Sequence, residues 1–141
     1  MSALYRLIYT SFRKAECDEE EIEKILASCK KNNPKRNITG ILLHADKRFI
    51  QYLEGSKKDV EELYQLIEKD NRHTSISRRN FELINERVFP SWEMGYKDMD
   101  NVVFNTDATK KDGEIFNKLI TAELNFDDNA MRILQIFFKM N

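Results

Sequence analysis

Two segments of this 141-residue chain repeat apolar residues in the spacing of an amphipathic helix, and strand-forming stretches surround them. The spacing i, i+3, i+4, i+7 places these residues along one side of each helix. They are Ile22, Ile25, Leu26 and Cys29 in the first segment and Val60, Leu63, Tyr64 and Ile67 in the second. Two helices that each have one apolar side need an apolar surface to cover, and the surrounding sequence predicts that this surface is a sheet.

The local signals around the two helices set their limits and the order of the elements. Asp18 and Ser56 are predicted N-caps, and Asn32-Asn33-Pro34 ends the first helix. Strands are predicted at 3–10, 38–45, 48–54, 81–88 and 92–97, with a tight hairpin turn at Asp46-Lys47. The order is therefore β-α-β-β-α-β-β. Its first six elements predict an α+β, ferredoxin-like fold with both helices on one face of a mostly antiparallel sheet.

The last third of the chain differs in character. Residues 98–112 are polar and predict a linker, whereas 114–124 and 129–140 carry two further helical patterns. Two helices alone do not make a stable domain, so we expect them to cover the bare sheet face or a partner's surface. We thus expect a domain over 1–98, with a linker and two-helix cap over 99–141 in the same folding unit.

Composition excludes several classes of protein. Lys and Arg number 23 against 24 Asp and Glu, so no global charge attracts nucleic acid, and the pair Arg78-Arg79 lacks interleaved aromatic residues. No run of apolar residues is long enough to span a membrane or form a signal peptide. Cys17 and Cys29 form no CxxC pair, which favours a reduced, cytoplasmic chain, and two distant histidines predict no metal site.

Alternation along the strands places two polar side chains in the layer beneath the helices. If Tyr9 faces the helices, then Phe49, Gln51 and Leu53 share its layer, as do Trp92, Met94 and Tyr96 on the last strand. A buried phenol and a buried amide need hydrogen-bond partners. Either Tyr9 and Gln51 satisfy each other, or a planar polar molecule lies between the helices. The residues alone leave both possibilities open.

Six strings in fixed order make the sequence resemble the BLUF family, bacterial blue-light sensors that use FAD. The resemblance covers about residues 1–98. The strings are LYRLIY from Leu4, KNNP from Lys31, NITGILL from Asn37, FIQYLEG from Phe49, DNRH from Asp70 and FPSWEMG from Phe89.

The resemblance implies a flavin between the two helices. It implies that Tyr9 gives an electron to the photoexcited flavin and that Gln51 bridges the Tyr9 hydroxyl and the flavin edge. Trp92 and Met94 would relay the signal. The other expected cofactor-binding residues are Ile25 and Ile67 on either side of the ring, Asn32 and Asn33 at the pyrimidine edge, Phe49 in the sheet layer, and Asp70, Arg72 and His73 towards the ribityl and phosphate end.

One position departs from the family pattern. Many members carry a basic residue where this chain has Leu66. Lys69 or Arg72 is a possible substitute in contacting the polar tail of the cofactor. FMN or riboflavin is therefore a possible alternative to FAD.

The expected output is conformational, without substrate turnover. Because no effector domain follows in this sequence, we expect a photoreceptor that acts on a separate effector protein or through its own assembly. The apolar faces of the last two helices fit either coverage of the sheet or a homo-oligomer interface. Two alternatives are a small flavin-dependent oxidoreductase and a cofactor-free ferredoxin-like interaction module. Against the enzyme, the chain has no nicotinamide-binding fingerprint, and Cys29 on an apolar helix stripe predicts an inert thiol.

Overall fold

The computed structural model describes residues 3–45, 47–88, 95–98, 103–104, 132–134 and 136–137. Its elements, in chain order, are β1 (Leu4–Arg13), α1 (Glu19–Asn32), the short 3-10 helix η1 (Pro34–Arg36), β2 (Thr39–Ala45), β3 (Arg48–Ser56), α2 (Lys57–Glu68), β4 (His73–Ile84), β5 (Gly95–Asp98) and β6 (Val103–Phe104).

The sheet has the strand order β4-β1-β3-β2-β5-β6. The first four strands pair antiparallel with their neighbours, whereas β5 runs parallel to β2. Order β4-β1-β3-β2 with a helix after β1 and after β3 is the ferredoxin-like arrangement, which confirms the predicted class.

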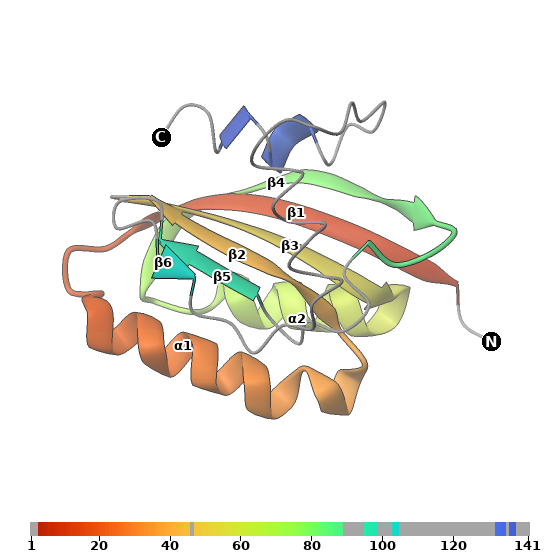
Figure 1. Cartoon of the computed structure of the whole chain (residues 1–141), viewed down its shortest axis with the longest axis horizontal. Coiled ribbons are helices and arrows are strands. Elements are labelled where there is room, and N and C mark those ends of the chain that lie inside the picture. The colour runs from red at the N-terminus through yellow and green to blue at the C-terminus, as the bar shows by residue number, and fades with distance from the viewer. Residues whose placement is uncertain are drawn as a thin grey trace.

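Both helices begin where their capping residues predict. Asp18 accepts a hydrogen bond from the Glu21 N–H at 3.0 Å, and Ser56 accepts one from the Asp59 N–H at 3.2 Å. Each bond satisfies one of the free N–H groups of a first helical turn. The two helices lie on the same face of the sheet (Figure 1).

The main apolar core fills the layer between the helices and the sheet. The buried residues of this cluster are Leu7, Tyr9, Leu42, Phe49 and Leu53 from the strands, Ile22, Val60 and Tyr64 from the helices, and Cys17 and Ile38 from connecting segments. The predicted alternation is thus confirmed for β1 and β3. Trp92 and Met94 lie outside the described residues.

Two predictions about the strands are wrong. β4 covers His73–Ile84 instead of 81–88, because residues 73–80 form a polar edge strand whose pairing with β1 is interrupted by register shifts. Such a segment lacks the apolar alternation that marks a half-buried strand. Within the predicted linker 98–112, Val103–Phe104 forms the two-residue strand β6 beside β5.

Five described residues near the end of the chain lie over the second face of the sheet. Residues 132–134 and 136–137 are helical and lie on the side of the sheet opposite α1 and α2 (Figure 1). Leu134 and Phe137 are buried, and the Arg48 guanidinium lies 5.5 Å from the centre of the Phe137 ring. The rest of the predicted terminal helices lies outside the described residues. None of the described helices has the length and apolar character needed to cross a membrane.

Candidate functional site

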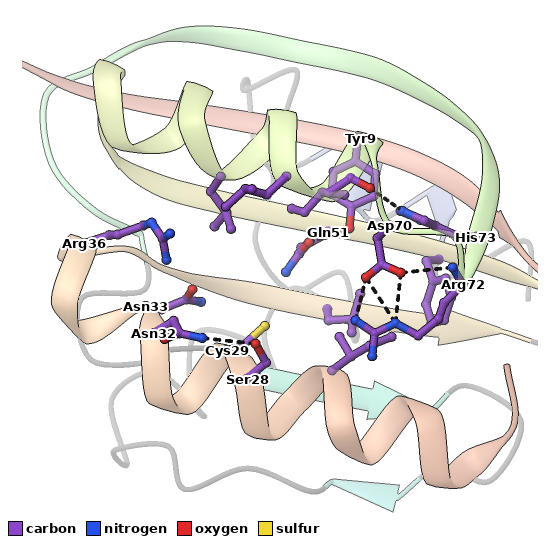
Figure 2. Close-up of a pocket in the computed structure, with 16 residues that line it drawn as sticks. Tyr9, Ser28, Cys29, Asn32, Asn33, Arg36, Gln51, Asp70, Arg72 and His73 are labelled. Carbon is purple, nitrogen blue, oxygen red and sulfur yellow. Dashed lines mark hydrogen bonds and ion pairs between the residues drawn. The ribbon is translucent and has the colours of Figure 1, made fainter.

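A pocket opens between α1 and α2 above the central strands (Figure 2). Its volume is about 200 Å³, several times the ~30 Å³ that one water molecule occupies in the liquid. Its apolar walls come from both helices and from the sheet. The residues of these walls are Ile25, Leu42, Phe49, Leu63, Leu66 and Ile67.

Tyr9 and Gln51 form the polar floor of the pocket. The two residues are cross-strand neighbours on β1 and β3. The Tyr9 hydroxyl donates a hydrogen bond of 2.5 Å to Oε1 of Gln51. Both side chains are buried, with 4% and 3% of their surface exposed. The predicted pair therefore exists, and it borders a cavity rather than a filled core.

Burial fixes the protonation state of Tyr9. The low-dielectric surroundings raise the pKa of its hydroxyl well above the ordinary value of 10, and the nearby acidic groups Cys29, Asp70 and Tyr64 raise it further. Tyr9 is therefore a neutral phenol with a proton to donate at physiological pH.

Cys29 extends this polar floor towards α1. Its thiol shares a side-chain hydrogen bond with Gln51, and burial raises its pKa to about 11. Protonation at neutral pH agrees with the inert thiol predicted from the sequence. Its position in the pocket wall, next to the Gln51 amide, was not predicted (Figure 2).

The end of α1 supplies amide groups to one side of the pocket. Asn33 is the C-cap of α1 and is buried, while the Asn32 amide donates to Ser28 at 3.2 Å. Arg36, the last residue of η1, lines the same end (Figure 2). Pro34 is the first residue of η1, where its fixed φ angle suits the start of a helical turn.

Asp70 and Arg72 form an ion pair at the opposite end of the pocket. Nη2 of Arg72 lies 2.6 Å from Oδ2 of Asp70, and the Arg72 backbone N–H also donates to Asp70. The hydrogen bond from the Arg72 side chain lowers the pKa of the Asp70 carboxyl group. Arg72 further approaches Glu21 on α1 at 3.8 Å, so the pair connects the α2–β4 loop with the first helix.

His73 joins three elements next to Tyr9. Its Nε2 lies 2.8 Å from the carbonyl oxygen of Ile67, and its Nδ1 lies 2.8 Å from Oγ of Ser11. A carbonyl oxygen only accepts, so Nε2 carries the proton and, in the neutral ring, Nδ1 accepts from Ser11. The ring centre is 6.1 Å from that of Tyr9, which ties the end of α2 to the polar floor.

The comparisons identify the family. A family model described as "Sensors of blue-light using FAD", BLUF, matches residues 4–95. The chain belongs to the BLUF family.

Three similar proteins illustrate the settings of this domain. The chain is 34% identical over 90 residues to photoactivated adenylate cyclase subunit beta of Euglena gracilis, covering 64% of this chain and 10% of that protein. It is 28% identical over 138 residues to the blue light- and temperature-regulated antirepressor BluF of Escherichia coli, covering 95% and 32%. The structure of Klebsiella pneumoniae BlrP1 with FMN and cyclic diGMP matches with a TM-score of 0.77 and 26% identity, covering 96% and 34%. The chain thus spans a tenth to a third of the length of these relatives.

BLUF proteins bind a flavin, and FMN is present in the BlrP1 structure. The pocket of this chain has the donor set that such a ring requires. Its walls are apolar side chains suited to a flat aromatic system, and its polar groups include the amides of Asn32, Asn33 and Gln51. Amides carry both donors and acceptors, as the carbonyl and nitrogen edge of a flavin does. The residues therefore fit the cofactor.

The site residues expected from the sequence lie together around one pocket. All the cofactor-binding candidates proposed from the sequence line this one pocket, as does Tyr9. Lys69 is absent from the lining, whereas Leu66 is part of it. The pocket is also lined by Ser28, Arg36, Leu42 and Leu63, which were not expected there from the sequence, and by Cys29, which was expected only as a core residue. Leu63 belongs to the predicted helix stripe and Leu42 to the Tyr9 layer, so their positions were available from periodicity.

Among the described residues, no three His, Cys, Asp or Glu side chains gather as a metal site.

Proposed function

We propose that this BLUF protein senses blue light through a reversible exchange of hydrogen bonds between Tyr9, Gln51 and the flavin. The observation that supports the proposal most strongly is the 2.5 Å bond between Tyr9 and Gln51 on the floor of the pocket. A buried neutral phenol is an oxidisable group with a transferable proton. It lies beside an amide, a side chain whose donor and acceptor ends can exchange places.

The proposed photochemistry leaves no net oxidation. When bound, the flavin would supply absorption of blue light and an acceptor for one electron and one proton. Tyr9 supplies both, and the Gln51 amide, which already accepts the Tyr9 hydrogen bond, passes the proton on. Electron and proton then return to the Tyr9 oxygen. Gln51 ends in a changed orientation or tautomer, so its hydrogen bond to the flavin carbonyl edge differs and the absorption shifts to longer wavelength.

The remaining pocket residues hold the cofactor in this proposal. Ile25 and Ile67 flank the ring from the two helices, and Phe49 supports it from the sheet. Asn33, with Asn32 beside it, pairs with the pyrimidine edge.

Arg72, with its partner Asp70 and the adjacent His73, faces the cofactor's polar side. The charge of Arg72 is already compensated by Asp70 at 2.6 Å, and Leu66 offers no charge there. We therefore expect the polar tail to contribute little, so that FAD, FMN and riboflavin bind with similar affinity.

The proposed output is a change of shape passed to a partner. Trp92 and Met94 precede β5 directly in sequence, and β5 pairs with β2 at Ile41 and Gly95. We propose that these two residues relay the change to β5 and the terminal helices, which then alter homo-oligomer contacts or the binding of a separate effector protein. The similar antirepressor of Escherichia coli supports an effector of this kind. The chain itself turns over no substrate in this account.

The test replaces Tyr9 by Phe and uses Tyr64→Phe as the matched control. Tyr64 is a second phenol with its ring centre 5.9 Å from that of Tyr9, and it does not line the pocket between α1 and α2. Tyr9→Phe should keep the flavin bound and abolish the red shift after blue illumination, because the electron and proton donor is gone. Tyr64→Phe should retain the shift. A normal red shift in Tyr9→Phe would refute the donor role.

A further inference from the structure

The two cations that line the pocket differ in their partners. Among the described lining residues, only Arg36 and Arg72 carry a permanent positive charge. Arg72 lies 2.6 Å from the Asp70 carboxylate and 3.8 Å from that of Glu21. No carboxylate in the described part of the chain forms an ion pair with Arg36. The protein therefore compensates the charge of Arg72 and leaves that of Arg36 available to a bound molecule.

Arg36 lies at the amide end of the pocket. Its guanidinium points into the pocket on the side of Asn32 and Asn33, whereas Asp70 and Arg72 lie at the other end (Figure 2). The Arg36 side chain is half-buried, so the charge is partly shielded from water. A charge in such a position interacts more strongly with a bound group than one on the open surface.

The backbone fixes Arg36 relative to Asn33. The N–H groups of Arg36 and Ile38 both donate to the carbonyl oxygen of Asn33, at 3.1 Å and 3.0 Å. Asn37 ends η1 in the left-handed region with a φ of 53°, which Asn adopts more readily than most residues. Nη2 of Arg87 donates to the Asn37 carbonyl oxygen at 2.6 Å. Asn33 and Arg36 thus belong to one fixed turn, and a cofactor edge held by Asn33 lies on the same side of the pocket as Arg36.

A guanidinium group suits the pyrimidine edge of a flavin. That edge carries two carbonyl oxygens, which accept hydrogen bonds, and it gains negative charge when the flavin takes up an electron. Arg presents a planar fork of N–H donors and keeps its charge at every physiological pH. Positive charge near this edge is one of the means by which a protein tunes the electronics of a flavin.

We propose that Arg36 binds the pyrimidine edge of the flavin, and that its charge raises both the affinity for the ring and the reduction potential of the bound flavin. The inference rests on the proposed function, which places this edge at Asn33. The contact is to the ring, so it is the same for riboflavin, FMN and FAD. A higher potential favours electron transfer from Tyr9 to the excited flavin.

The experiment measures the affinity and the potential of the flavin-loaded full chain, prepared with riboflavin or with FMN. Loaded protein is diluted and the released flavin is measured by its fluorescence, and the potential is measured against a dye of known potential. The variants are Arg36→Gln, which removes the charge and keeps an amide donor, and Arg36→Lys, which keeps the charge.

Lys35→Gln is the matched control. Lys35 precedes Arg36 in η1, is exposed and does not line the pocket. Its replacement removes the same charge near the C-terminal end of α1, where a cation is favourable in any case. Lys35→Gln therefore measures what the loss of a charge does without the proposed contact.

We expect Arg36→Gln to raise the Kd of riboflavin and of FMN by the same factor, about tenfold, which is the lower end of the range for a hydrogen bond to a charged group. The reduction potential should become more negative in this variant. Arg36→Lys should retain most of the wild-type potential, because the charge remains. Lys35→Gln should resemble the wild type in both measurements.

Four results would overturn the inference. They are wild-type affinity and potential in Arg36→Gln, a loss of affinity confined to FMN, which would assign Arg36 to the phosphate, an equal fall in potential for Arg36→Lys and Arg36→Gln, and equal effects of Lys35→Gln and Arg36→Gln. The red shift of the same samples under blue light tests the proposed function separately. Its absence from the flavin-loaded wild type would contradict that function, whereas the affinity and the potential decide the role of Arg36.

Discussion

At the scale of single residues, burial between the sheet and the helices alters the pKa values and the hydrogen bonding of the side chains in the site. Tyr9 lies in a layer of apolar residues, and burial keeps its phenol protonated far above neutral pH. Burial also keeps the Tyr9 hydroxyl away from water, and its hydrogen bond goes to Oε1 of Gln51. Cys29 adds a neutral thiol on the far side of the amide. Tyr9 and Gln51 are therefore buried in low-dielectric surroundings, where a changed hydrogen bond has a large effect.

Asp70 makes a prediction about acid stability. The Arg72 hydrogen bond lowers the pKa of Asp70 in the folded chain, relative to about 4 when unfolded. A lowered folded pKa contributes stability above about pH 4, and this contribution is lost as pH falls through the folded value. Asp70→Asn should therefore lower the melting temperature at pH 7 more than at pH 3.

The exposed Glu62 on α2 provides the control for this measurement. Glu62→Gln should change the melting temperature little at either pH, because surface charges contribute little. An equal loss of melting temperature at pH 7 and pH 3 for Asp70→Asn would contradict the role of the ion pair.

At the scale of elements, the sequence predicts those helices and strands whose limits are set by neighbouring residues in the chain. The capping side chains of Asp18 and Ser56 and the apolar stripes place α1 and α2 correctly. β4 was mispredicted because its first residues pair with β1 as a polar edge, so nothing in their own alternation shows the strand. Arg36 lines the pocket because it lies in the short helix η1, and the periodicity of the sequence does not predict this turn.

Gly40 on β2 makes a prediction about close packing of the sheet. A Cβ atom added there would collide with the backbone carbonyl of Tyr52 on β3, which cannot rotate away. Gly40→Ala should lower the free energy of unfolding in urea by about 3 kcal/mol, the upper end of the usual cost of overpacking.

Gly55→Ala is the matched comparison within the same sheet. There the added Cβ meets the side chains of Ile38 at 3.1 Å and Val60 at 3.3 Å, which can adjust. We expect a loss of about 1 kcal/mol. Equal losses for the two variants would show that the β2–β3 spacing is not the constraint.

At the scale of the whole molecule, the sheet separates two tasks. Its helix-covered face holds the pocket with Tyr9 and Gln51, and its other face carries the charged residues Arg6, Glu54 and Glu82 at paired positions of three neighbouring strands. The sequence predicted the first face because apolar alternation marks it. It did not predict the second, because Arg6, Glu54 and Glu82 resemble solvent-exposed charges until the strands bring them together.

The absorption spectrum of the purified protein, recorded before and after blue illumination, tests the central claim most directly. The account predicts the banded spectrum of an oxidised flavin in the dark. Under blue light it predicts a shift to longer wavelength, without bleaching, that reverses in darkness. A protein that binds flavin but shows no reversible shift, or one that bleaches to a reduced flavin and consumes a reductant, would contradict it.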